Sequence, residues 1–337
     1  MKKQKVKSYA NYPKGYPKTI PVYKSRKSKL YQAKLCIADI IISIKSFDKA
    51  GWWIKDFPEC DDILKNFNYT GKRKPNINIV VKIVKKEPSK NRFKKVFTTI
   101  HFKTREVNWD LYRNKSKYLF ISPIEHKKLY AYFTDSFDNA EVSILPDFEH
   151  KEKPWLIKDI IYNFLQVLMI HYCISRNAIF VHAAAIKDSD GKGYLFFGGP
   201  NSGKSTISTL WHEHSKALVL NDDCVILKKI DNKFYFFAVP WRGGFDIYLK
   251  GNQNKARLDK IFILKKNKNN RIVKISDRRF FNIFYANIFV PFWKKDSIGK
   301  IFDFFNSLTR KTDLLSLFFR KDKSIIKTVR YYNGKKR

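Results

Sequence analysis

The sequence contains no run of about 18 apolar residues, the length that a helix needs to cross a bilayer. Its two richest apolar stretches, Ile160–Ile174 and Phe280–Trp293, are interrupted by polar residues, so we expect them to be buried elements. The N-terminus is basic, but it has prolines at positions 13, 17 and 21 and lacks the hydrophobic region of a signal peptide. These absences predict a cytoplasmic protein with no membrane partner.

Cysteine is scarce, with four residues in a chain of 337. The four cysteines lie far apart and none forms a C-x-x-C pair; they are Cys36, Cys60, Cys173 and Cys224. This spacing argues against a zinc site and against a disulfide framework.

Acidic residues are also few, because 30 Asp and Glu face 68 Lys and Arg, which gives a formal net charge of +38. The basic residues are spread along the whole chain and do not form one stripe, so we do not favour nucleic acid as the partner. The exception is the segment 1–30, which has ten Lys or Arg, three prolines and no acid. It is either a basic flexible tail or an arm that binds an acidic partner, and its composition does not allow it to fold alone.

The length and the 44% hydrophobic content allow two domains. We expect a mainly β accessory domain over residues 31–150 and a second domain over 154–330. The short-strand pattern of the first domain predicts strands at Leu30–Lys45, Ile77–Val84, Phe93–Phe102, Tyr118–Ile121 and Leu129–Phe133. Trp52, Trp53 and Trp109 could stack on a ligand, although aromatic residues in a β domain more often belong to its core.

The most informative stretch is Gly193–Thr206, which reads as a short apolar strand followed by a phosphate loop. It matches G-x-x-x-x-G-K-S/T at Gly198, Gly203, Lys204 and Ser205. Glycines let backbone N–H groups turn toward phosphate oxygens, and the helix that follows directs its positive end at the same anion. We therefore expect nine residues to contact ATP: Gly198, Gly199, Pro200, Asn201, Ser202, Gly203, Lys204, Ser205 and Thr206. Among these, Lys204 supplies charge at the β- and γ-phosphates, and the Ser205 hydroxyl suits Mg²⁺.

The elements around this loop follow from proline positions, apolar periodicity and turn residues. Pro154 is expected to open a helix that ends at Ile174, and the loop helix is expected to run from Lys204 to about His212. The strands and hairpins that we expect are Ile179–Ile186, Ala217–Leu220, Val225–Ile230 with Phe234–Val239 joined by Asp231-Asn232, and Ile261–Lys265 with Arg271–Ile275. The remainder is expected to be a helical tail rich in Phe.

Three further features could take part in chemistry. Asp222 and Asp223 follow an apolar strand, as the Mg²⁺-directed acid of a phosphate-loop enzyme does. Paired carboxylates can divide their roles, one ionised at the metal and one with a raised pKa that accepts a hydroxyl proton. His182 is either a satisfied core histidine or a site residue on the strand before the loop strand. Arg242, followed by two glycines, is either a surface arginine or a group that neutralises a transferring phosphoryl group.

Four segments, in this order, resemble HPr serine kinase and its relatives. They are Phe-Val-His-Ala at 180–183, the phosphate loop, Leu-Asn-Asp-Asp at 220–223 and Pro-Trp-Arg-Gly at 240–243. The resemblance covers about residues 154–330. It implies an α/β (α+β) phosphate-loop domain with a mixed sheet, of the phosphoenolpyruvate carboxykinase/HPr kinase-like type. The mainly β accessory domain precedes it in this chain.

The resemblance also implies roles for single residues. In that family the histidine that corresponds to His182 lies in the active site, and Lys204 and Ser205 correspond to the nucleotide and Mg²⁺ residues. One aspartate of the pair accepts the proton of the substrate serine. We place that role on Asp223 and expect Asp222 to be a Mg²⁺ ligand with Ser205.

The sequence also departs from the family pattern. Ala183 stands where HPr kinases have a glycine, and Pro240 stands where they have a glutamate that helps to hold Mg²⁺. Residues 31–150 do not resemble the usual N-terminal domain of the family. HPr is therefore not assigned as the substrate, and divergent relatives that act on precursor peptides of ribosomally made natural products are the closer match.

The sequence thus predicts an ATP- and Mg²⁺-dependent kinase that transfers the γ-phosphate to a hydroxyl, with a serine of a protein or peptide as the expected acceptor. The alternative is a nucleotide-binding regulatory or nucleic-acid-associated module without phosphoryl transfer. The acid pair and His182 favour the enzyme, whereas a continuous basic groove leading from the loop would favour the module. The sequence also leaves open whether the chain forms a homo-oligomer.

Overall fold

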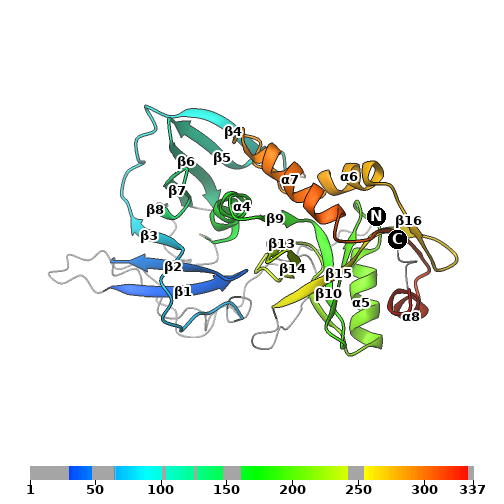
Figure 1. Cartoon of the computed structure of the whole chain (residues 1–337). Helices are drawn as coiled ribbons and strands as arrows, with labels where there is room; N and C mark the ends of the chain where they lie inside the picture. Colours follow the sequence, from blue (N-terminus) through cyan, green and yellow to red (C-terminus); the bar gives the residue numbers. More distant parts are fainter. Residues whose placement is uncertain are drawn as a thin grey trace, which may run out of the picture.

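The computed structural model describes residues 30–47, 64, 66–100, 104–124, 127–146, 161–241 and 254–332. These residues form a mixed α/β structure with two mixed β-sheets and few helices (Figure 1). Several expected features lie outside them: the tail before Leu30, Cys60, Trp52, Trp53, the start of the helix at Pro154, and Arg242. Within the described part of the chain, no helix is long and apolar enough to cross a membrane.

The first sheet has eight strands in the order β1-β2-β3-β8-β7-β6-β5-β4. Neighbouring strands are antiparallel except at β3, which is parallel to both β2 and β8. The bounds are β1 Tyr31–Ile37, β2 Ile40–Ser46, β3 Ile77–Ile83, β4 Lys94–Ile100, β5 Val107–Asn114, β6 Lys117–Ile124, β7 Lys127–Thr134 and β8 Asn139–Pro146.

Two features of this sheet differ from the sequence expectation. The single strand expected over Leu30–Lys45 is a hairpin, because Ala38 and Asp39 both have positive φ, 52° and 64°, and reverse the chain between β1 and β2. Asp39 is a residue type found in such turns, but Ala38 is not, so the sequence signal for a turn is weak. Strands β5 and β8 were not expected from the sequence at all. Trp109, on β5, is 9% exposed and packs in the core.

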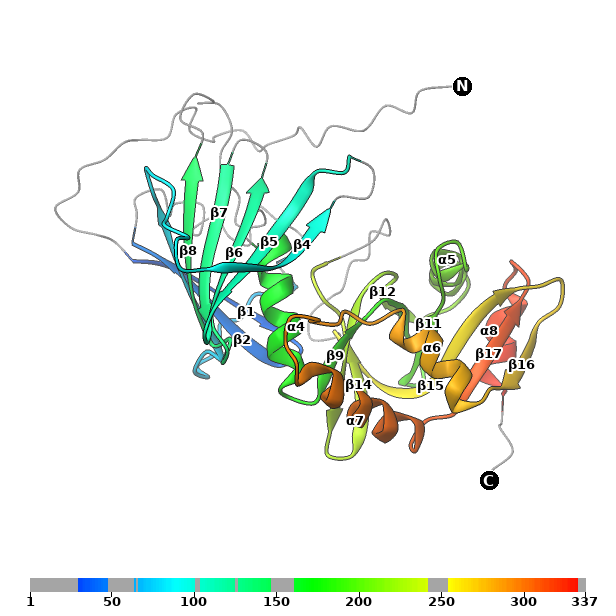
Figure 2. The same ribbon diagram turned by 90° about the horizontal axis from the view of Figure 1, so that it is seen from above.

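A helical segment lies between the two sheets, as Figure 2 shows. It starts as a π-helix, η2, over Ile161–Leu165 and continues as α4, over Gln166–Ile174, so its expected end at Ile174 is correct. Every α4 residue after Gln166 is buried. A helix that is apolar on all sides fits this position, since both sheets cover it. One hydrophobic core therefore runs from the first sheet through α4 into the second sheet.

The second sheet has nine strands in the order β12-β10-β11-β15-β14-β13-β9, and β17 pairs with β15 and with β16. The pairs β11 with β15 and β15 with β17 are parallel, and the others are antiparallel. The strands are β9 Ala178–Val181, β10 Ala183–Lys187, β11 Lys192–Phe197, β12 Leu218–Asn221, β13 Val225–Ile230, β14 Lys233–Phe237, β15 Lys255–Lys266, β16 Arg271–Lys274 and β17 Leu314–Phe319.

Helices cover both faces of this sheet. They are α5 Lys204–His214, α6 Asp277–Tyr285, α7 Ser297–Thr309 and α8 Ser324–Arg330. Phe196 of β11 points into a cluster with α5 and α8, whereas the next residue, Phe197, contacts α6 through Phe280 and Phe284 at ring distances of 6.1 and 5.9 Å. The alternation of a strand buried on both faces explains why β11 reads as a continuous apolar run.

The strand expected over Ile179–Ile186 is broken at His182. Its first part, β9, pairs with β13, whereas its second part, β10, pairs with β11 and β12. At the break, the His182 N–H donates to the Asn287 carbonyl at 2.6 Å, and Val181 forms a bridge with Ile288. This contact with a distant segment cannot be read from the local sequence.

One expected hairpin is present and one is not. Strands β13 and β14 pair through Asp231 and Asn232, whose positive φ values of 46° and 60° suit a two-residue turn. Strands β15 and β16 do not pair with each other, because β17 lies between them. The expectation of a purely helical tail is therefore wrong at β17, where a short apolar run does not distinguish a buried strand from a helix.

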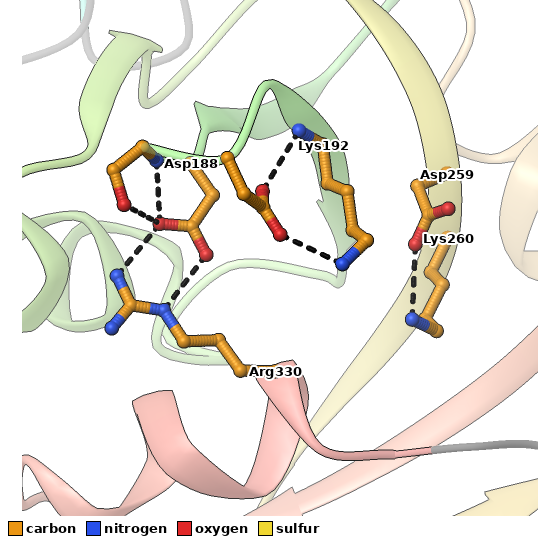
Figure 3. Close-up of polar contacts among 7 residues, drawn as sticks. Asp188, Lys192, Asp259, Lys260 and Arg330 are labelled. Carbon is orange, nitrogen blue, oxygen red and sulfur yellow. Dashed lines mark hydrogen bonds and ion pairs between the residues drawn. The ribbon is translucent and has the colours of Figure 1, made fainter.

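A buried ion pair attaches α8 to the turn between β10 and β11 (Figure 3). Arg330 donates two hydrogen bonds to the Asp188 carboxylate, at 2.8 and 2.7 Å, and the Ser189 N–H donates to the same group at 2.7 Å. Asp188 is 3% exposed. The Arg330 guanidinium also lies 5.4 Å from the ring centre of Trp211 on α5. The pair thus joins α8 to the sheet and to α5.

Replacing Arg330 by methionine is expected to leave the buried Asp188 carboxylate without its charged partner. We expect the free energy of unfolding to fall by about 3 kcal/mol, the low end for breaking a buried pair, because the Arg330 side chain is 34% exposed. Urea unfolding measures this change. Arg320→Met is the matched control, because its ion pair with Asp322 is exposed to solvent, which screens the charges, so the loss should be much smaller. Equal losses in the two variants would contradict the assigned role.

His171 of α4 is a buried neutral histidine in the core between the sheets. Its Nδ1 donates to the Val167 carbonyl at 2.9 Å, and its Nε2 accepts a hydrogen bond from Trp293. Its ring stacks on Phe137 at 4.3 Å. Burial lowers the pKa of His171 to about 3, because a charged imidazole would lose its water, and the nearby charge of Lys294 acts in the same direction.

This lowered pKa predicts a pH dependence of stability. His171 takes up its proton near pH 6.5 in the unfolded chain but only near pH 3 in the folded chain. The contribution of His171 to the free energy of unfolding is therefore complete above about pH 6.5 and is lost as the pH falls toward 3. Each pH unit within that range should cost about 1.4 kcal/mol. Urea unfolding of wild type and His171→Gln at several pH values tests this, because the variant should lack this part of the slope. The same slope in both proteins would show that His171 does not titrate in this way.

Candidate nucleotide and acceptor site

The phosphate loop connects β11, in the interior of the second sheet, to α5. Gly203 has a φ of +107°, which a residue with a side chain rarely adopts, and a Cβ there would meet the Phe319 ring. A Cβ on Gly198 would collide with the Ser202 hydroxyl. Gly203 is therefore required by its backbone conformation, and Gly198 by the Ser202 side chain that lies against it. The tip formed by Gly199, Pro200 and Asn201 is exposed.

Lys204 lies at the start of α5 and is 9% exposed. Its Nζ donates to the Gly198 carbonyl at 2.7 Å and approaches the Gly199 carbonyl at 3.4 Å, so the side chain spans the loop from within. Burial lowers the pKa of Lys204, while the charges of Asp223 and Asp222 oppose that shift. A partly desolvated ammonium group is suited to an anionic ligand, whereas the two acids beside it would repel that anion unless a cation lay between them.

The acid pair follows β12, at the same edge of the sheet as the phosphate loop. Both β11 and β12 are antiparallel to β10, so their carboxyl ends meet at this edge. The Ser205 hydroxyl donates to Asp222 Oδ2 at 3.1 Å. Asp222 Oδ1 is buried and has no hydrogen-bond partner among the described residues. The two residues expected at Mg²⁺ are thus in direct contact.

His182 and Asp223 form a second pair at this edge. His182 Nδ1 lies 3.2 Å from Asp223 Oδ1, and the two side chains are 35% and 40% exposed. Asp222, by contrast, is only 5% exposed. The site is therefore graded, with Lys204 and Asp222 buried and the His182–Asp223 pair accessible to a molecule that arrives from solvent. Of the two open interpretations of His182, the geometry excludes the satisfied core histidine.

The two carboxylates have opposite pKa directions. Burial raises the pKa of Asp222, and the hydrogen bond from Ser205 only partly offsets it. The hydrogen bond with His182 lowers the pKa of Asp223 despite partial burial. This is the reverse of the sequence expectation, in which the metal ligand stays ionised and the proton acceptor has the raised pKa. The reason is depth, since Asp222 lies under the loop and Asp223 has a histidine partner.

The structure brings together most of the residues that the sequence singled out. The nine loop residues from Gly198 to Thr206, the acid pair and His182 lie around the carboxyl ends of β11 and β12. Arg242 lies outside the described residues, which reach Trp241 and resume at Asn254. Pro240 is buried.

Sequence reasoning gave no role to Asn221, which lies between these groups. Its side chain accepts hydrogen bonds from the Asp223 and Cys224 N–H groups and donates to the Trp241 carbonyl. An asparagine at the end of an apolar strand is a known signal for a turn stabilised by its side chain. That signal could have identified Asn221.

The donor set fits a nucleotide with Mg²⁺. Asp222 Oδ1 and Ser202 Oγ are both buried and unpartnered among the described residues, which suits groups that complete their contacts with a ligand. The described residues contain no group of three or more His, Cys, Asp or Glu side chains that could hold a metal ion. Mg²⁺ in phosphate-loop proteins does not need one, because it is held by one or two protein oxygens and the phosphates.

No protein-family model matches the sequence, and no curated protein sequence matches it either. Its function is therefore inferred from the residues and their geometry.

Proposed function

We propose that this protein is an ATP- and Mg²⁺-dependent kinase that transfers the γ-phosphate to a hydroxyl group. The observation that carries the proposal is that two neighbouring acids, Asp222 and Asp223, bind different partners in the turn after β12. Asp222 binds the Ser205 hydroxyl of the phosphate loop, whereas Asp223 pairs with His182 and faces solvent. A nucleotide-binding module without chemistry needs the first contact only.

We also propose that the domain expected over residues 154–330 has the phosphate-loop fold of phosphoenolpyruvate carboxykinase and HPr kinase. Two features support it. The loop leaves a strand with one antiparallel and one parallel neighbour, within a mixed sheet. The histidine, loop and acid-pair segments, which resemble the family in their order along the chain, converge at one edge of that sheet.

In the proposed mechanism, the loop backbone and Lys204 bind the β- and γ-phosphates. Ser205 Oγ and Asp222 would hold Mg²⁺, which neutralises phosphate charge when it is bound. Binding to the metal would also favour the ionised form of Asp222, against the effect of its burial.

Asp223 orients the acceptor hydroxyl and receives its proton. The hydroxyl oxygen forms a bond to the γ-phosphorus as the bond to the β,γ-bridging oxygen breaks; the proton passes to Asp223 and ADP leaves. The lowered pKa of Asp223 is compatible with this role, because phosphoryl transfer depends more on positioning than on a strong base. His182 keeps the carboxylate ionised and oriented.

A serine of a protein or peptide is the acceptor that we propose. The support is the resemblance to serine kinases, together with the exposed position of the His182–Asp223 pair, which a side chain of a large substrate can reach. Ala183 and Pro240 differ from the HPr kinase pattern, so the proposal does not extend to HPr.

Nucleotide binding should depend on Lys204 and should be linked to Mg²⁺ through Ser205. Lys204→Ala is expected to weaken ATP binding at least about tenfold, because it removes a charge-assisted contact to the phosphates. Ser205→Ala should weaken binding only when Mg²⁺ is present. Calorimetry with ATP, with and without Mg²⁺, measures both effects. Unchanged ATP affinity in Lys204→Ala would sink the assignment of the loop.

Asp223→Asn keeps the shape of the side chain and removes its basicity. We expect nearly normal ATP affinity and a loss of transfer of about a hundredfold or more, the usual scale for a positioned general base. A single-turnover assay with radiolabelled ATP and serine-containing peptides measures the chemical step. Asp231→Asn, in the exposed turn after β13, is the matched control and should not change the rate.

The same assay separates the two candidate functions. Full transfer by Asp223→Asn would refute its role as proton acceptor. Nucleotide binding without transfer to any hydroxyl by the wild-type protein would favour the regulatory or nucleic-acid-associated module.

A further inference from the structure

Asn221, the last residue of β12, joins three segments around the His182–Asp223 pair. It is 2% exposed. Its Oδ1 accepts from the N–H groups of Asp223, at 2.9 Å, and Cys224, at 3.2 Å. Its Nδ2 donates to the Trp241 carbonyl at 2.8 Å and reaches the Val239 carbonyl at 3.4 Å. Both ends of the amide are thus fully used, which a buried asparagine requires.

The segment on the donor side leads back to the histidine. The Trp241 ring lies edge-on against Phe180 at 5.6 Å, and Phe180 is two residues before His182. The Phe180 carbonyl accepts from the Phe289 N–H at 3.1 Å, and the His182 N–H donates to the Asn287 carbonyl at 2.6 Å. The segment from Phe180 to His182 is therefore held by Trp241 on one side and by residues 287–289 on another.

These contacts form a closed circuit. It runs from Asn221 through the acid turn to Asp223 and His182, back along the strand to Phe180, and through Trp241 to Asn221. Because the contacts form a closed loop, the separation of His182 and Asp223 is set both by the turn that holds Asp223 and by the packing of Trp241 on the segment that holds His182. We propose that Asn221 is a positioning residue that sets this separation, and hence the rate of phosphoryl transfer, without contributing to nucleotide binding. This inference rests on the proposed function.

Because Asp223 is exposed, its side chain depends on these contacts for its position. Its side chain is 40% exposed, and among the described residues its one hydrogen-bond partner is His182, so its own packing does not fix it. A displacement of about 1 Å in a reacting group can cost about a hundredfold in rate. The nucleotide residues do not share this need, because Lys204 and the Ser205–Asp222 contact are held from the loop side.

Two substitutions separate the contributions of the acceptor and the donor of the Asn221 side-chain amide, which are the two arms meant below. Asn221→Asp keeps an acceptor for the Asp223 and Cys224 N–H groups but removes the donor and places a negative charge against two carbonyl oxygens. Asn221→Ala removes both arms. If the circuit sets the pair, both variants should lower the single-turnover rate at least about tenfold. The dissociation constant for ATP should change less than about twofold in each.

Asn163→Ala is the matched control, because Asn163 is a partly buried asparagine that bonds Asn108 and Ser122 beside the first sheet. It should leave the transfer rate at the wild-type value. Thermal melting accompanies every variant. If Asn221→Ala does not fold, Asn221→Asp and Asn221→Ser, which both keep an oxygen acceptor, take its place in the assay.

The outcomes are distinct. A wild-type transfer rate in Asn221→Ala would overturn the inference, and so would an equal weakening of ATP affinity and rate. A wild-type rate in Asn221→Asp would overturn the link through Trp241. If the wild-type protein itself transfers no phosphate, the proposed function falls together with this refinement; if it transfers and the variants match it, only the role of Asn221 falls.

Discussion

The coiling of the second sheet is the constraint on which the site depends. Strands β9 and β10 have four strands between them in the order of the sheet, yet only His182 separates them in the chain. In a flat sheet, five steps of about 4.8 Å would place them about 24 Å apart. The two peptide steps across His182 span at most about 7 Å. The sheet must therefore curl until its β9 side returns to β10, and the point of closure is the residue that pairs with Asp223.

The same closure divides the electrostatics of the site by depth. Groups under the phosphate loop, Lys204 and Asp222, lose water and shift toward their neutral forms. Asp223, at the rim, shifts toward its charged form because a histidine partner outweighs partial burial. A chain with a formal charge of +38 thus places two carboxylates beside its phosphate loop, where general attraction to polyanions would be better served by more lysine. This arrangement favours chemistry on a bound phosphate over non-specific binding.

Local signals in the sequence predict many of the site residues, but they do not predict how the second sheet curls to bring β9 back to β10. The phosphate loop is predictable because one of its glycines, Gly203, has a backbone conformation that other residues rarely adopt. The β13–β14 turn is predictable for a similar reason. The break at His182 is not, since it depends on the carbonyl of Asn287, and neither is β17, whose partners β15 and β16 are set by tertiary pairing. The pKa order of the acid pair also escapes the sequence, because it depends on depth.

The contact between Phe319 and Gly203 has a consequence for the order of assembly. Phe319 ends β17, which completes the wall behind the phosphate loop, and α8, which follows it, is held by the Asp188–Arg330 pair. A helix of seven residues is too short to persist alone, so it forms only on this surface. During synthesis, the loop leaves the ribosome long before the segments that support it. A nascent chain that already contains the whole phosphate-loop motif therefore still lacks the side chains that pack against the loop in the folded protein.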